Sequence, residues 1–185
     1  MNGLSGSRRL ARPVRLLLAG HLGADIDGAW WPHTGSVAAE LPELIGVLHA
    51  PLGEIVDIAI NWSTTEGPVD FDSIITGART MDRPGPRRPR LMKVEGRGSS
   101  ANLLVVPYMT APNLGAMVMR CAAGLPAEHA DRGSQLWETA RTVMSVARAE
   151  SAMWAGRLRG AAQSSSARPT ISGSGSPTTS SSFSS

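Results

Sequence analysis

The sequence predicts a single α/β (or α+β) domain in which a mixed sheet of about five strands packs with three helices. Three observations predict it. Short apolar runs have the spacing of strands, three longer segments have helical spacing, and residues 161–185 are rich in Ser, Gly and Pro with neither period. We therefore expect a flexible basic N-terminus over 1–13, a globular domain over 14–160, and a disordered tail over 161–185.

The first half of the domain has the order strand, helix, strand. The stretch "VRLLLA" (14–19) predicts a short strand, and "EIVDIAINW" (54–62) alternates apolar and polar residues as a half-buried strand does. Between them, 36–50 carries apolar residues at helical spacing behind a Ser36 cap, with Pro42 bending or restarting the helix. This order predicts a βαβ unit with a right-handed crossover.

The second half predicts three strands and two helices. We expect a strand over "FDSIITGA" (71–78) and, after a loop rich in Pro and Arg, a hairpin of 91–96 and 101–107. A helix over 111–124 follows. The last and longest helix covers 134–159.

The formal net charge is +3, but the charges form blocks. Residues 16–78 hold nine acidic groups and no Lys or Arg, whereas 79–97 hold seven basic groups and two acidic ones. Such blocks are typical of solvated faces that partly neutralise each other. They also allow a homodimer in which opposite blocks meet.

Composition excludes several classes of protein. No apolar run approaches the ~20 residues that span a bilayer, and Ser7-Arg8-Arg9 is not followed by the clean apolar region of an export signal, so we expect a cytoplasmic protein. The single Cys121 cannot form an internal disulfide or a cysteine-rich zinc site. Phosphate-binding loops, dinucleotide turns and G-x-S-x-G elbows do not occur, so we expect no recognised enzyme class and no cofactor.

Four short segments are similar to segments of a known family. "DGAWWP", "AAELPEL", "IAINW" and "NLLVVP" resemble an uncharacterised family of small bacterial proteins, a domain of unknown function found mostly in high-GC organisms. The resemblance covers roughly residues 14–125 and implies a fold boundary but no established activity. In the family's usual pattern a basic residue follows Trp-Trp-Pro, where this chain has His33. The family also commonly has aromatic residues in its middle strands, which this chain lacks.

The segment "DGAWWP" is the best candidate for a small-molecule site. Adjacent side chains of an extended segment point to opposite faces, so Trp30 and Trp31 can serve different purposes. In one interpretation both indoles fill core and Asp27 holds a turn. In the other, Asp27, Trp30 and Trp31 line a ligand pocket with Asn61 and Trp62, at the carboxyl ends of the strands of the βαβ unit.

Two further interpretations of this region stay open. An enzyme of unrecognised class could use Asp27 with His21 or His33. The set His21, Asp25, Asp27 and His33 has the residue types of a divalent-metal site, but it matches no known ligand spacing, and we predict no metal.

The basic segment 83–97 is the candidate for an anionic partner. Arg87, Arg88, Arg90 and Lys93 could contact phosphates, so nucleic-acid binding is the second alternative function. No aromatic residue alternates with these charges to stack bases, and for this reason we do not expect nucleic acid to be the partner.

The last predicted helix carries large apolar side chains on more than one side. One stripe should cover the sheet. A second, with Trp137 and Trp154, is a candidate contact for a protein partner or for a second copy in a homodimer. The sequence as a whole predicts a non-enzymatic domain that binds a small molecule or a protein.

Overall fold

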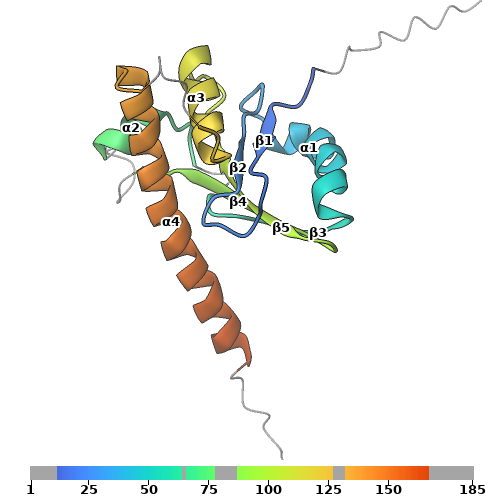
Figure 1. The fold of residues 1–185 in the computed structure, drawn as a ribbon. Helices are drawn as coiled ribbons and strands as arrows, with labels where there is room; N and C mark the ends of the chain where they lie inside the picture. The colour runs from blue at the N-terminus through green and yellow to red at the C-terminus, as the bar shows by residue number, and fades with distance from the viewer. Residues whose placement is uncertain (1–11, 64–65, 78–86, 127–131, 167–185) are drawn as a thin grey trace, which may run out of the picture.

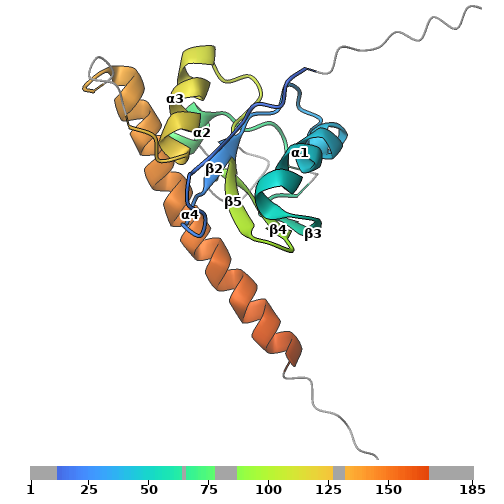
Figure 2. The same ribbon diagram turned by 45° about the vertical axis from the view of Figure 1, so that its right-hand side comes forward.

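The computed structural model describes residues 12–63, 66–77, 87–126 and 132–166. This part of the chain forms a five-stranded mixed sheet with helices on both faces (Figure 1, Figure 2), which confirms the predicted fold class. A fourth helix joins the three that the sequence predicts. Helix α1 (Val37–Leu52) covers one face, and α2 (Phe71–Thr76), α3 (Pro112–Ala122) and α4 (Gln135–Ser166) lie on the other.

The strands of the sheet have the order β1-β2-β5-β4-β3. Strands β2 and β5 are parallel, and the other neighbouring pairs are antiparallel. The predicted hairpin is present as β4 and β5, and the two edges of the sheet are β1 and β3. The bounds are β1 Leu16–Leu18, β2 Gly28–Trp30, β3 Ile55–Ile60, β4 Arg90–Gly96 and β5 Ser100–Val105.

The predicted βαβ unit is wrong in its pairing. Strands β1 and β3 lie at opposite edges of the sheet and run in opposite directions. The cause is β2, a three-residue strand that the sequence pattern does not predict, because it returns antiparallel beside β1 before the chain enters α1. Helix α1 therefore connects β2 to β3, two strands of the same direction that are separated by β5 and β4.

The predicted strand over 71–78 is also wrong, because Phe71–Thr76 form helix α2, while residue 78 lies outside the described residues. The Asp70 carboxylate caps the helix by accepting a hydrogen bond from the Ser73 N–H at 2.7 Å. Gly77 ends the helix in the left-handed conformation, with φ at 63°. These two end signals outweigh the strand propensity of the β-branched run between them.

The sheet divides the hydrophobic core into two parts. The α1-side core contains Trp30, packed with Leu44 and Leu48 of α1. The α3-side core contains Trp31 together with Met117 of α3 and apolar residues of α2 and α4. As predicted for an extended segment, the adjacent indoles point to opposite faces; both are buried, with 1% and 7% of their surface exposed.

The C-terminal part of α4 extends beyond the rest of the described chain (Figure 1), and its residues 156–164 are exposed. The predicted tail from residue 161 begins inside this helix. Residues 167–185 lie outside the described residues, as do residues 1–11 of the predicted N-terminal segment. None of the described helices combines the length and the apolar character needed to cross a membrane.

Candidate functional site

A cavity of about 310 Å³ opens at one end of the sheet, where the parallel strands β2 and β5 end and β4 begins. The carboxyl ends of parallel strands are a usual place for ligands in α/β proteins. The side chains around it are mostly apolar. They include Val37, Val69, Ile74, Val105 and Val106, together with the polar Thr34, Glu66, Arg90 and Tyr108.

Two prolines explain why the strands separate at this point. The Val106 N–H still donates a hydrogen bond to the Trp30 carbonyl at 2.9 Å. The next residue after Val106 is Pro107, and the second after Trp30 is Pro32, and neither has an N–H to extend the ladder. The two chains therefore diverge, and the segments that follow them form part of the cavity wall.

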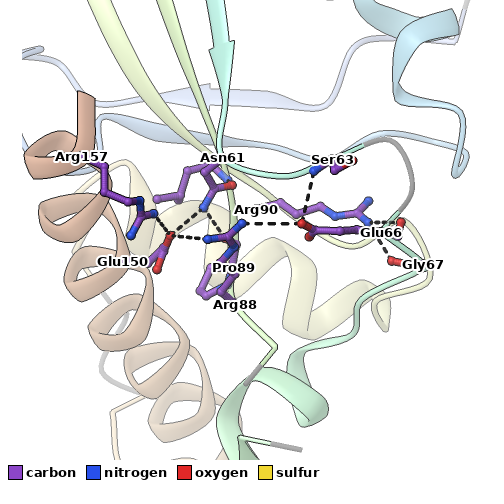
Figure 3. Close-up of polar contacts among 10 residues, drawn as sticks. Asn61, Ser63, Glu66, Gly67, Arg88, Pro89, Arg90, Glu150 and Arg157 are labelled. Atoms are coloured by element: carbon purple, nitrogen blue, oxygen red, sulfur yellow. Dashed lines mark hydrogen bonds and ion pairs between the residues drawn. The ribbon is translucent and has the colours of Figure 1, made fainter. Parts of the chain in front are cut away.

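Arg90, the first residue of β4, supplies the positive charge of the cavity (Figure 3). Its Nη2 donates to the carbonyl oxygens of Glu66 at 3.1 Å and Gly67 at 2.8 Å. Its guanidinium carbon lies 5.6 Å from the centroid of the Trp62 ring, within the range of a cation–π contact. Burial lowers the pKa of Arg90, while the nearby Glu66 carboxylate acts in the opposite direction. The side chain stays protonated, as guanidinium groups in proteins do.

Glu66 supplies the negative charge of the cavity wall, and its carboxylate is already engaged. Oε1 accepts a hydrogen bond from the Ser63 N–H at 3.3 Å and lies 3.6 Å from Nη2 of Arg88. By contrast, no carboxylate in the described part of the chain forms an ion pair with Arg90. The cavity thus holds a paired carboxylate and a guanidinium whose charge is not paired.

Arg88 connects the cavity wall to α4 (Figure 3). Its guanidinium lies 3.6 Å from the Glu66 carboxylate and 3.8 Å from Oε1 of Glu150. Glu150, 5% exposed, also accepts hydrogen bonds from Asn61 Nδ2 at 3.1 Å and Arg157 Nη2 at 2.8 Å. A buried carboxylate is tolerated when it is paired and hydrogen-bonded in this way. The network holds α4 against the ends of β3 and β4.

Asp27 directly precedes β2, and its carboxylate holds backbone N–H groups of neighbouring segments in place. Its side chain is 1% exposed, and its Oδ1 accepts the N–H groups of Gly23 at 2.7 Å and Ala24 at 2.8 Å. Its Oδ2 accepts the Asn102 N–H at 2.8 Å. Asp27 and Asn61 are not brought together, because three strand spacings, about 14 Å, separate β2 from β3.

Asn61, at the end of β3, also binds backbone groups through its side chain. Its Oδ1 accepts the Leu91 N–H at 2.8 Å, and its Nδ2 donates to the Pro89 carbonyl at 3.0 Å. The amide extends the pairing of β3 with β4 beyond the last ladder bond and then reaches Glu150 of α4. Its side chain therefore faces α4.

The tryptophans of the predicted pocket divide between the two cores. Trp30 belongs to the α1-side core and Trp62 packs against it, whereas Trp31 belongs to the α3-side core. The Arg15 guanidinium lies 3.9 Å from the centroid of the Trp31 ring and donates to the Trp31 carbonyl. None of the five predicted residues is among the described residues that line the cavity, but Trp62 contacts Arg90, which does line it.

The predicted anion-binding residues are spread along β4 and the segment before it. Arg88 and Arg90 take part in the network at the cavity wall. Arg87 donates to a carbonyl of the segment before α2. Lys93 lies farther along the strand and is paired with a carboxylate of the same strand at 2.6 Å. Residues 83–86 of the basic segment lie outside the described residues.

Of the two histidines considered for catalysis or metal binding, His33 has other contacts and His21 faces solvent. The His33 N–H donates to Glu40 at 2.8 Å, and its Nε2 lies 3.0 Å from the Pro13 carbonyl. His21 is exposed. Among the residues that the structure describes, no group of three or more His, Cys, Asp or Glu side chains could hold a metal ion.

The two tryptophans of α4 face the body of the domain. Trp154 belongs to the α3-side core with 8% of its surface exposed, and Trp137 packs against that core. The large apolar side chains that α4 exposes are Met153 and Leu158. The partner contact through this helix stays a prediction.

Sequence reasoning missed most of the cavity residues. The segment 66–69 has no apolar period, and Tyr108 lies in a turn, so the sequence pattern predicts a functional role for neither. The available signal was the proline that ends each of two apolar runs, Pro32 after Trp-Trp and Pro107 after Val-Val. A strand pair that stops at two prolines marks a place where a sheet opens.

Comparisons with curated proteins and with solved structures gave no match. A comparison with protein families did: the profile of a family of unknown function, DUF5994, matches residues 15–122. Among the described residues, the matched range contains all five strands, helices α1 to α3 and every residue that lines the cavity, and it ends before α4. The chain therefore belongs to the DUF5994 family.

Proposed function

We propose that this protein is a non-enzymatic binding domain that holds a small molecule in the cavity at the ends of β2 and β5. The observation that carries the proposal is the cavity itself, about 310 Å³ with apolar walls around one partly buried guanidinium. Small-molecule sites are typically concave and mostly apolar, with a few polar groups that orient the ligand. The volume is at the lower limit of such sites, which favours a compact ligand.

The chemistry of the lining favours binding over catalysis. Among the described residues that line the cavity there is no histidine or cysteine, and the Thr34 hydroxyl donates to Glu40. The enzyme alternative depends on Asp27, but both oxygens of this residue accept backbone N–H groups. A general base needs a free oxygen within hydrogen-bond reach of a substrate. The bacterial origin, the cytoplasmic location, the homodimer and the nucleic-acid role stay predictions.

The test is a thermal-shift screen of the full chain against common metabolites, with two glycine variants as a matched pair. A ligand at a hundred times its dissociation constant adds about 2.7 kcal/mol to the free energy of unfolding, a shift of several degrees. Gly67 lines the cavity and a Cβ there meets no atom within 4 Å, so Gly67→Phe narrows the cavity without a clash at Cβ. Gly46 is the control: it lies on the exposed side of α1, a Cβ there also meets no atom within 4 Å, and it does not line the cavity.

We expect at least one metabolite to raise the melting temperature of the wild type and of Gly46→Phe, and to have a much smaller effect on Gly67→Phe. A metabolite that stabilises all three chains equally would place its site elsewhere and contradict the proposal. A panel without any hit would also count against it.

A further inference from the structure

We infer that the ligand of this cavity is a small carboxylate with an apolar body, whose carboxylate group binds the Arg90 guanidinium. This inference rests on the proposed function and adds the chemical class of the ligand. It follows from the charges of the cavity, from its apolar walls and from the fixed orientation of the Arg90 guanidinium.

The charges of the cavity leave a place for one anionic group. The two ionised side chains in its described lining are Glu66 and Arg90. The Glu66 carboxylate is held by the Ser63 N–H and by Arg88, whereas Arg90 donates only to two backbone carbonyls. The Glu66 carboxylate is near Arg90 but forms no ion pair with it, so an anion that accepts a hydrogen bond from this partly buried guanidinium would be stabilised there.

A singly charged anion fits these surroundings better than a phosphate ester. The Glu66 carboxylate stands in the same lining and repels a second negative charge. The rest of the lining is mostly apolar, with side chains such as Val69, Ile74 and Val105, which would contact a hydrocarbon body. Both N–H groups of Nη2 are taken by the two backbone carbonyls, so a ligand carboxylate would accept a charge-assisted hydrogen bond from Nη1 of Arg90.

The guanidinium is held in place before any ligand arrives. Two carbonyls of the segment 66–67 hold its Nη2, and the Trp62 ring lies beside it at 5.6 Å. A group that is already oriented loses little conformational entropy on binding. Arg90 is thus organised as an anchor.

The test compares matched charged and neutral probes on the full chain. Phenylacetate is compared with phenylacetamide, and hexanoate with hexanamide, each titrated to about 10 mM because fragment-sized ligands bind with only about 4 kcal/mol. Binding is followed by amide chemical shifts in a ¹⁵N-labelled protein. We expect each carboxylate to bind about tenfold or more tightly than its amide, as a charge-assisted hydrogen bond predicts.

Three variants test whether the preference for carboxylates over amides depends on Arg90. Arg90→Met should reduce the carboxylate-to-amide ratio to about one, and Arg97→Met should leave it unchanged, because Arg97 is an exposed arginine of the same hairpin. Glu66→Gln removes the repelling charge, so it should strengthen carboxylate binding a few-fold and leave amide binding unchanged. If Arg90→Met fails to fold, Glu66→Gln decides: a carboxylate affinity that is unchanged or lower overturns the inference.

The outcomes separate this inference from the proposed function. Equal binding of carboxylates and amides, lost in Gly67→Phe, would overturn the inference and leave the binding cavity intact. Carboxylate binding that Gly67→Phe does not weaken would contradict both, because the site would lie elsewhere. Absence of binding by every carboxylate probe would overturn the inference.

Discussion

Asp27 fixes three backbone N–H groups with one buried carboxylate. It joins the turn before β2 to the edge of β5, so the position of the whole Trp-Trp segment depends on it. Removing the carboxylate would leave three donors without their acceptor at a site that is 1% exposed. Leaving buried donors without an acceptor is one of the few ways in which a single substitution strongly destabilises a protein.

We expect Asp27→Ala to lower the free energy of unfolding by about 2–4 kcal/mol, measured by urea denaturation. Asp25→Ala is the matched control, since Asp25 is exposed and accepts the Ser151 hydroxyl through its backbone carbonyl. The control should stay within about 0.5 kcal/mol of the wild type. A similar, small loss in both variants would show that the three N–H groups find other acceptors.

Glu40 gives the fold a defined dependence on pH. Its carboxylate accepts the N–H groups of His33 and Thr34 and the Thr34 hydroxyl, at 2.7–2.8 Å. Burial opposes ionisation, but these hydrogen bonds outweigh it and lower the pKa of Glu40. A lowered folded pKa stabilises the fold fully above the ordinary value of 4.5, and this stabilisation is lost as pH falls through the folded value.

The corresponding prediction compares Glu40→Gln with the wild type over pH. The variant should be less stable by about 1–2 kcal/mol at pH 7, and the difference should shrink in acid below the ordinary glutamate pKa. Glu43→Gln, on an exposed position of the same helix, should show little difference at any pH. A difference that grows on acidification would refute the sign of this argument.

Helix α3 packs directly on Trp31 because Gly115 has no side chain. A Cβ at this position would lie 2.5 Å from two atoms of the Trp31 ring, closer than real contacts allow. Glycine inside a helix is ordinarily a weakness of about 0.5–1 kcal/mol relative to alanine. Here the close approach of helix and indole reverses that order.

Gly115→Ala should therefore destabilise the protein by about 1–3 kcal/mol, through overpacking against Trp31. Gly156→Ala, in the exposed part of α4 where a Cβ meets no atom within 4 Å, should instead stabilise it slightly, by up to about 1 kcal/mol. Both are measured by thermal and urea unfolding. Gly115→Ala with wild-type stability would mean that Trp31 shifts at no cost.

The elements that the sequence predicted are those with a long or regular pattern. Helices α1, α3 and α4 carry apolar residues at helical spacing over three or more turns, and the β4–β5 hairpin consists of two short apolar runs on either side of a turn. Strand β2 is only three residues long, too short for a period to show. In α2 the end signals at Asp70 and Gly77 matter more than the strand-forming residues between them.

At the scale of the whole molecule, α4 is the element that completes the fold. The residues matched to the family end at 122, so α4 lies beyond them. The helix nevertheless buries Ala140, Val143, Met144 and Ala147 in the α3-side core. Glu150 then joins it to Asn61 and Arg88, and through Arg88 to the cavity wall.

We expect Glu150→Ala to cost about 3 kcal/mol of folding free energy, because it leaves the buried Asn61 amide and two guanidinium groups without their acceptor. Glu138→Ala on the same helix removes an exposed ion pair with Arg141 and should cost less than about 1 kcal/mol. Urea denaturation measures both, and hydrogen exchange shows whether α4 loosens first. Equal effects would mean that the network adds nothing to the packing of α4.

The candidate site was predicted only in part, and the reason is topological. The sequence predicted Arg90 as a candidate anion-binding residue, from its basic segment, and the ends of strands as a place for a ligand. It could not show that β2 lies between β1 and β5, and this pairing places Pro32 beside Pro107. Asp27 and Asn61 lie beside strands because their side chains accept hydrogen bonds from backbone N–H groups that have no partner in the sheet, and not because they line a ligand pocket.

The opposite directions of Trp30 and Trp31 have a consequence for changes in chain length. A substitution such as Trp30→Phe would leave a cavity in one core, but the directions of the neighbouring side chains would persist. An inserted or deleted residue between Asp27 and Pro32 would turn the indoles that follow it toward the wrong layers, because side chains on extended backbone alternate strictly. The segment should therefore tolerate changes of residue far better than insertions or deletions, even of a single residue.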